Sequence, residues 1–469
     1  MEKLFSPVAR WLKGELSSCE RFFTGAIYPP IAAALALLSH LTGLEYLFGG
    51  ISIVLLCLAM LTCRSGRPIL TFSLSIIFHV SLENAPGVPT FSSYLFSGWR
   101  LVAFALLAGA VAVCLIAFIV RNRCLSHFSI RMPQLIPLLI LSVAFLTNGI
   151  LGGSWSGADL VHGLCQAGVY LGLYLLYYLT LKGEDGDGLC RYLVYVCSTV
   201  AWLLIAQVLV RLMAEGVIVN GSVDKNAMVF GWGVWNTAGV SLTVLLPICF
   251  IGVMRTRHPV YYFATAIAAY LAAVLTMSRG ALLFGGIAFV ICCILSCFVG
   301  DNKRVCRIVT LGGIAVCLGG LVLVWDKLTM LLQDFIDRGF SDNGRYELWR
   351  IGWENFLKAP LFGIGFFSFV SDSFTVAEFF PKLAHQTLIQ FLSSTGLFGT
   401  LAYLYYRFVT ILPVVRRRTL IKWMLFGSVL VLLAQSAIDT YMFRFHALLL
   451  YSATLAIIEH LDAEQAENK

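Results

Sequence analysis

Charged residues are scarce in this sequence. Asp, Glu, Lys and Arg make up 12% of its 469 residues, whereas a typical soluble domain has about 25%. Hydrophobic residues reach 59%, and the mean hydropathy is +0.85. This composition excludes an ordinary soluble enzyme, a disordered chain and a disulfide-stapled secreted module, so a polytopic membrane protein remains. The apolar runs are continuous and do not alternate with polar residues, which favours spanning helices over a transmembrane β-barrel.

The sequence also lacks the usual signatures of metal and nucleotide sites. No HExxH, Walker or Rossmann pattern occurs in it. Its 14 cysteines show no zinc spacing, and Cys292, Cys293 and Cys297 lie on an apolar stretch where packing is the simplest role. We therefore expect no metal and no cofactor. The net charge of +8 is explained by basic residues in cytoplasmic loops, so we expect no nucleic-acid partner.

Fourteen apolar stretches predict membrane-spanning helices, each of which needs about 20 residues. They lie near 22–43, 45–63, 68–83, 99–120, 134–152, 159–181, 190–213, 234–254, 259–276, 279–298, 307–325, 386–407, 421–438 and 441–459. The first three are the weakest, because Pro29 and Pro30 interrupt the first and the third is short. We therefore expect an all-α polytopic membrane protein with about 12–14 transmembrane helices. Residues 1–21 hold no continuous apolar core, and the apolar face within 5–16 predicts a helix at the membrane surface.

The distribution of Lys and Arg predicts the orientation in the membrane. If the N-terminus lies inside and the spans alternate, most of the 33 basic residues fall in inner segments. This agrees with the positive-inside rule, which places Lys and Arg in cytoplasmic loops. Both ends of the chain, 1–21 and 460–469, are then expected in the cytoplasm.

One predicted connection is unusually long. Residues 326–385 contain no spanning stretch, and they separate the transmembrane parts 22–325 and 386–459. The alternation of spans places this segment on the outer side of the membrane. Long loops in compact proteins are usually functional, so we expect the active part of the protein here.

Two short amphipathic helices are predicted within this extracytoplasmic loop. Apolar residues at helical spacing in 328–336 predict a helix on the membrane surface, and 345–358 predicts a second one, which Pro360 ends. Arg345 opens the second helix. It is a candidate for binding an anion, although Asp342 could instead hold it in a local ion pair.

Three further side chains on the outer side could carry chemistry. Arg279 stands between two spans with almost no loop, and it could reach lipid phosphates or bind a diphosphate bidentately. Arg350 has Glu347 and Glu354 at helical pairing distances, which favours an ion pair. His385 ends the long loop, where it could be a general base near neutral pH or only a polar anchor.

Arg279, Arg345 and His385 lie in three motifs that follow one another in the chain. Residues 275–281 read LTMSRGA, 344–349 read GRYELW and 359–365 read APLFGIG; 384–386 read AHQ and lead to STGLFG at 394–399. Over roughly residues 230–405 the sequence resembles the O-antigen ligase / O-antigen polymerase superfamily of bacterial envelope polysaccharide glycosyltransferases. Each motif alone is weakly specific, but the order of the three around one long loop is more so.

The resemblance implies a metal-independent glycosyltransferase in the bacterial cytoplasmic (inner) membrane. Such an enzyme transfers a glycan from undecaprenyl diphosphate to a sugar hydroxyl, on lipid A–core in a ligase or on another lipid-linked repeat in a polymerase. By position, Arg279 would bind the diphosphate, and Arg345 would join it or stabilise the loop. His385 would be the general base or would orient the acceptor.

The sequence departs from the family pattern at two places. The residue after the histidine is Gln386, where the family often has Asn. An earlier outer loop has Lys225, where the family often has an Arg before an Asn-containing motif; Lys225 would bind substrate as a point charge, without the bidentate fork. Arg350 remains an additional candidate for substrate binding.

Two alternatives to a glycan ligase or polymerase remain at the level of sequence. A flippase for lipid-linked oligosaccharides would show two similar halves, and none are visible. A noncatalytic assembly or sensor subunit would not need His385. The ligase is favoured slightly over a polymerase of O-antigen or capsular polysaccharide.

Overall fold

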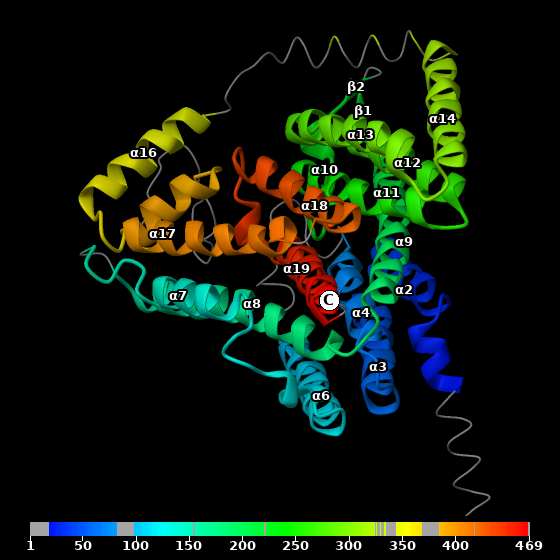
Figure 1. The fold of residues 1–469 in the computed structure, drawn as a ribbon. Helices are drawn as coiled ribbons and strands as arrows, with labels where there is room; N and C mark the ends of the chain where they lie inside the picture. Colours follow the sequence, from blue (N-terminus) through cyan, green and yellow to red (C-terminus); the bar gives the residue numbers. More distant parts are fainter. Residues whose placement is uncertain are drawn as a thin grey trace, which may run out of the picture.

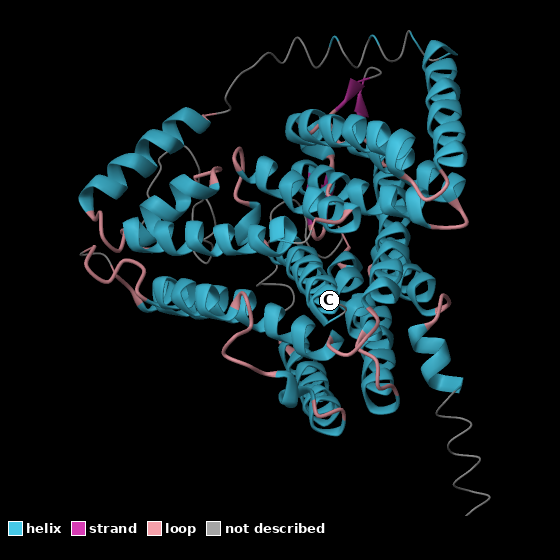
Figure 2. Cartoon of the chain, in the orientation of Figure 1, coloured by secondary structure: helices cyan, strands magenta, loops and turns pink. Residues whose placement is uncertain are grey.

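Helices form almost the whole structure (Figures 1 and 2). The computed structural model describes residues 18–81, 98–152, 155–219, 222–323, 344–367, 384–416 and 418–467, and the single residues 325, 329 and 333. Its α-helices are α2 (Tyr28–Thr42), α3 (Glu45–Thr62), α4 (Arg67–Ser75), α6 (Trp99–Arg121), α7 (Leu135–Leu146), α8 (Gly157–Leu181), α9 (Gly186–Leu212), α10 (Trp235–Thr243), α11 (Leu246–Arg255), α12 (Pro259–Leu275), α13 (Arg279–Val299), α14 (Lys303–Leu323), α16 (Arg345–Lys358), α17 (Thr387–Arg416), α18 (Leu420–Ser436) and α19 (Phe445–Glu467). Short 3-10 helices are η1 (Ile76–His79), η2 (Cys124–His127), η3 (Lys225–Ala227) and η4 (Tyr441–Phe443).

Strand structure in the described residues is confined to two small antiparallel pairs. β1 (Ile218–Val219) pairs with β2 (Ser222–Val223), and β3 (Val229–Phe230) pairs with β4 (Gly233–Val234). Both pairs lie in the connection between α9 and α10. The prediction of an all-α polytopic membrane protein is confirmed.

The helices differ in their ability to cross a bilayer. In the described part of the chain, seven helices are long and apolar enough to span it, or eight if the bent pair Ser18–Thr24 and Tyr28–Thr42 forms one span. Each of the fourteen expected ranges contains helix, but several helices are short or broken. The range 68–83 forms only the nine-residue α4 and then η1, and nine residues rise about 14 Å against about 30 Å of hydrocarbon.

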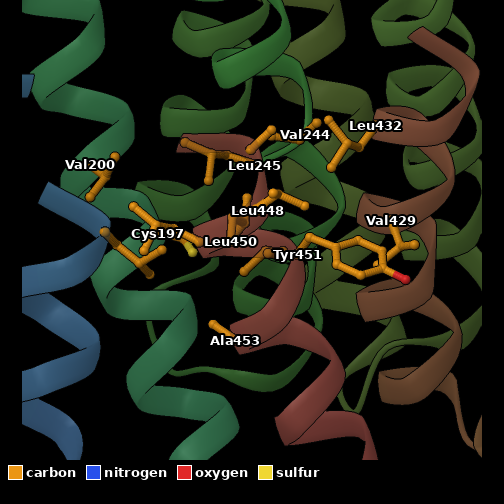
Figure 3. Packing of buried hydrophobic residues seen from close by; sticks show 14 of the residues in the cluster. Cys197, Val200, Val244, Leu245, Val429, Leu432, Leu448, Leu450, Tyr451 and Ala453 are labelled. Atoms are coloured by element: carbon orange, nitrogen blue, oxygen red, sulfur yellow. The ribbon is translucent and has the colours of Figure 1, made fainter. Parts of the chain in front are cut away.

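The hydrophobic core joins helices from both halves of the chain. Figure 3 shows Cys197 and Val200 of α9 facing Leu448 and Leu450 of α19, with Leu432 of α18 nearby. All of these side chains are buried. Because α9 and α19 lie far apart in sequence, this packing brings the last part of the chain into the centre of the bundle.

A break in α17 anchors the part of the long loop that directly follows α16. Gly396 has φ 66° and ψ −160°, a conformation that essentially only glycine adopts. The peptide groups exposed by this break bond to the segment after α16: the Leu397 N–H donates to the Pro360 carbonyl at 2.8 Å, and the Ile364 N–H donates to the Ser393 carbonyl at 2.9 Å. The α16–α17 connection is therefore held at its beginning, where it leaves α16 beside α17 (Figure 1).

The α7–α8 hairpin holds the same segment from the other side. The buried carboxylate of Asp159 accepts a hydrogen bond from the Phe367 N–H at 2.9 Å and also caps α8 through Ser156. Asn148 accepts from the Phe366 N–H at 3.3 Å. A buried acid at a predicted span end is thus a structural clamp.

The described residues include the second predicted helix of the long loop but only part of the first. The helix Arg345–Lys358 is confirmed, with the predicted bounds. The predicted surface helix at 5–16 and most of the one at 328–336 lie outside the described residues. The orientation of the chain and the division into 1–21, 22–325, 326–385, 386–459 and 460–469 stay predictions.

Candidate functional site

A polar cavity of about 70 Å³ lies where α13 begins, α16 begins and α18 ends. Its wall consists of Trp235, Asn236, Met277, Ser278, Arg279, Gly280, Arg345, Gln435, Ile438, Asp439 and Tyr441. Two of the cations predicted from the sequence therefore face one cavity, although they are separated by 66 positions in the chain (345 − 279). The cavity can accommodate a small polar or anionic group.

Arg279 is fixed by the turn between α12 and α13. Met277 has φ 58°, an uncommon conformation for a residue that is not glycine and one that often marks a functional turn. Ser278 then caps α13 and accepts a hydrogen bond from the Ala281 N–H at 3.4 Å. Arg279 is the first residue of α13, so its guanidinium and the partial positive charge of the helix N-terminus act in the same region.

Arg345 has an equivalent position on α16. Gly344 has φ 76° and precedes the helix, so Arg345 is its first residue. The buried face of α16 holds the helix in place, since Leu348 is 3% exposed and packs with the buried Ala384. A second helix N-terminus and a second guanidinium are thereby brought to the cavity.

His385 contacts the carboxylate of Asp439. The His385 Nδ1 atom lies 3.2 Å from Asp439 Oδ1, and the side chains are 36% and 5% exposed. His385 has φ 50°, a backbone conformation that is uncommon for a residue other than glycine. A neutral His385 that donates Nδ1–H to Asp439 has its lone pair on Nε2, which is the form of a general base.

Asp439 is held as a carboxylate by its surroundings. Burial raises the pKa of its carboxyl group, but the hydrogen bond from His385 and the positive charge of Arg444 outweigh this effect and hold the pKa below its usual range. The Thr440 N–H also donates to Asp439 Oδ1 at 2.8 Å. A negative charge is therefore present beside His385 at neutral pH.

The role of Asp439 was not found from the sequence. The residue directly follows the predicted span 421–438, and it lies 54 positions after its partner (439 − 385). The sequence held one weak signal. Asp439 follows the predicted span 421–438, and His385 precedes the predicted span 386–407, so both residues are expected at outer span ends. Asn236, Gln435 and Tyr441 were likewise given no place at the site.

The two other predicted binding residues are placed differently. Arg350 donates to Glu347 and to Glu354, each at 2.6 Å, so the ion-pair interpretation of this residue agrees with the structure. It is not among the described residues that line the cavity. Lys225 begins the 3-10 helix η3, and its side chain lies outside what the structure describes.

An apolar groove of about 510 Å³ lies between α13 and α18. Its lining residues are Pro247, Phe284, Ile287, Ala288, Ile291, Cys292, Leu295, Leu420, Trp423, Met424, Gly427, Leu430, Val431 and Ala434. The groove and the polar cavity are neighbours along both helices, since Gly280 and Phe284 are one turn apart on α13, and Ala434 adjoins Gln435 on α18. An apolar groove therefore lies next to a cationic cavity.

Comparison with known proteins identifies one matching region. Residues 263–404 match the family model of the O-antigen ligase. The match includes Arg279, Arg345 and His385, while Asp439 lies beyond its end. No curated protein matches the chain. Among the described residues, no group of three or more His, Cys, Asp or Glu side chains is arranged to hold a metal ion.

Proposed function

We propose, because residues 263–404 match the family model of the O-antigen ligase, that the protein transfers a glycan from undecaprenyl diphosphate to a sugar hydroxyl. The family supports a membrane enzyme of polysaccharide biosynthesis that performs ligase-type or polymerase-type glycosyl transfer. The observation that carries the proposal is the convergence of Arg279, Arg345 and Asp439 on one cavity, together with the contact that joins Asp439 to His385.

The two arginines would stabilise the leaving group. In the proposed reaction the acceptor oxygen forms a bond to the anomeric carbon, and the bond from that carbon to the diphosphate oxygen breaks. The electron pair leaves with the diphosphate, whose negative charge grows in the transition state. Arg279 and Arg345, each at a helix N-terminus, supply fixed positive charge where it develops.

His385 would accept the proton of the acceptor hydroxyl. The proton would pass to Nε2, and the resulting imidazolium would be stabilised by the Asp439 carboxylate 3.2 Å from Nδ1. Asp439 acts on the reaction through His385, because it selects the tautomer and the ring orientation. General-base catalysis of this kind is worth about 10²–10⁴ in rate.

The groove between α13 and α18 would receive the polyprenyl chain. The lining is almost entirely apolar, which suits an isoprenoid, and the groove lies next to the cavity where the diphosphate would bind. Because the tail already lies in hydrocarbon, the groove would hold it by shape and van der Waals contact, not by removing it from water. A lipid-linked donor therefore explains why the cationic cavity and the apolar groove adjoin.

The first experiment measures the length of lipid-linked glycan in a deletion strain complemented with wild type or His385→Ala. Long glycans that accumulate on undecaprenyl diphosphate indicate a missing ligase, whereas single repeats that still reach the surface indicate a missing polymerase. Matched controls are His258→Ala and Arg257→Ala, which alter exposed residues. If His385→Ala complements as well as wild type, the proposed catalytic role is wrong. Donor that accumulates on the inner leaflet, with no glycan at the surface, would support the flippase instead.

A further inference from the structure

A buried arginine, Arg407, lies in the second half of α17. It is 8% exposed, and the Nε and Nη1 atoms have no hydrogen-bond partner among the described residues. A charged side chain inside a membrane protein is unfavourable unless it is compensated. No predicted role on the outer side involves this residue, so its surroundings need an explanation.

Aromatic rings surround the guanidinium of Arg407. Its Cζ atom lies 4.5 Å from the ring centre of Tyr403, 4.9 Å from that of Tyr406 and 4.5 Å from that of Tyr451. Cation–π contacts of this kind are stronger when they are desolvated, so these rings compensate in part for burying the charge. We call Arg407 and these three tyrosines the tyrosine box.

The tyrosine box contacts the segment that carries Asp439. The Arg407 Nη2 atom lies 2.6 Å from the Met442 Sδ atom, and the Tyr170 hydroxyl donates to the Met442 carbonyl at 2.6 Å. Met442 is fully buried and belongs to η4, three residues after Asp439. The position of η4 is thereby fixed from α17 and α8.

A third contact fixes the other end of this segment. The Thr387 hydroxyl donates to the Asp439 carbonyl at 3.1 Å, and Thr387 is the first residue of α17. The part of α17 before the Gly396 break therefore holds Asp439, and the part after it holds Met442. The first part also follows His385 directly, so it contacts both partners of the His385–Asp439 pair.

We propose that Arg407 is a positioning residue, which holds residues 437–444 so that Asp439 meets His385. This inference rests on the proposed function, because its effect on turnover passes through the proposed base. An apolar side chain of similar size would satisfy packing without burying a charge. Unlike an apolar side chain, the planar guanidinium contacts the faces of three tyrosine rings and Met442 at the same time. The flexible ammonium of a lysine makes such contacts less well.

The test is a double-mutant cycle between Arg407→Lys and Asp439→Asn, measured as kcat in reconstituted vesicles with a lipid-linked glycan donor. We expect Arg407→Lys to lower kcat at least tenfold in the wild-type background and less than about threefold in the Asp439→Asn background, because coupled residues are not additive. Arg407→Met provides a second variant, and Arg255→Lys, an exposed arginine paired with Asp301, is the matched control. Equal loss in both backgrounds overturns the proposal and leaves a purely structural role.

A spectroscopic measurement separates this inference from the proposed function. The ¹⁵N shifts of the His385 ring report its tautomer and its hydrogen bond. We expect Arg407→Lys to change them in the same direction as Asp439→Asn, with the fold preserved. If the wild type has no transferase activity but these shifts change, the proposed function fails and the positioning role stands. If the His385 ¹⁵N shifts of Arg407→Lys are the same as those of wild type, the positioning role is wrong.

Discussion

Replacing Asp439 with Asn tests the central pair of the candidate site while preserving its size. The substitution removes the negative charge 3.2 Å from His385 Nδ1. In the proposed mechanism His385 becomes positively charged as it accepts a proton, so the loss falls on the transition state. Donor binding depends on the two arginines, and we expect it to change little.

The size of the effect follows from the geometry. Two unit charges 3.2 Å apart interact by about 5 kcal/mol at an effective dielectric constant of 20. The His385 side chain is 36% exposed, and we halve the value to about 2.5 kcal/mol because solvent screens the pair. This corresponds to a loss of about 10² in kcat.

The assay is steady-state transfer in reconstituted vesicles at fixed acceptor and varied donor. Asp301→Asn, which alters an exposed acid paired with Arg255, is the control for removing a carboxylate. A decrease in kcat with an unchanged donor KM is the expected result. An Asp439→Asn enzyme that keeps a third or more of the wild-type kcat would refute the reasoning.

Three other substitutions test separate parts of the structure. Arg279→Lys should raise the donor KM about tenfold, because an ammonium lacks the bidentate fork; an unchanged KM for the diphosphate donor contradicts this. Gly427→Trp should fill the apolar groove and weaken binding of long polyprenyl donors but not of a short-chain diphosphate, and equal effects on both speak against the tail site. Gly396→Ala should lower the melting temperature of the protein in detergent, because its Cβ would lie 2.5 Å from the Leu361 carbonyl carbon at a positive φ; an unchanged melting temperature excludes the anchoring role.

Local sequence predicted the helix Arg345–Lys358 of the long loop well. Gly344 and Pro360 bracket it, and the observed helix is Arg345–Lys358 as expected. Similar local signals set the helix that begins at Arg279, where Ser278 is the cap. Helix boundaries of this kind depend on neighbours a few residues away, so a sequence contains them.

Span lengths were less predictable. Apolar composition marks a segment as buried, but it does not distinguish contact with lipid from contact with other helices. The α10–α11 segment is an example, since its window is entirely buried within the protein and the helix breaks between Thr243 and Leu246. Short or broken helices such as α4 are possible where neighbouring helices satisfy the backbone.

The sequence by itself determined the class of the protein, the helix that starts at Arg345 and the identity of the candidate side chains Arg279, Arg345 and His385. These features follow from composition, from local helix signals and from motifs in which every residue is close in the chain. The tertiary structure alone decided that both arginines line one cavity and that Asp439 contacts His385. It also decided that Arg407 contacts Met442, three residues after Asp439. Such contacts join positions tens to hundreds of residues apart, and only the packing of the helices brings them together.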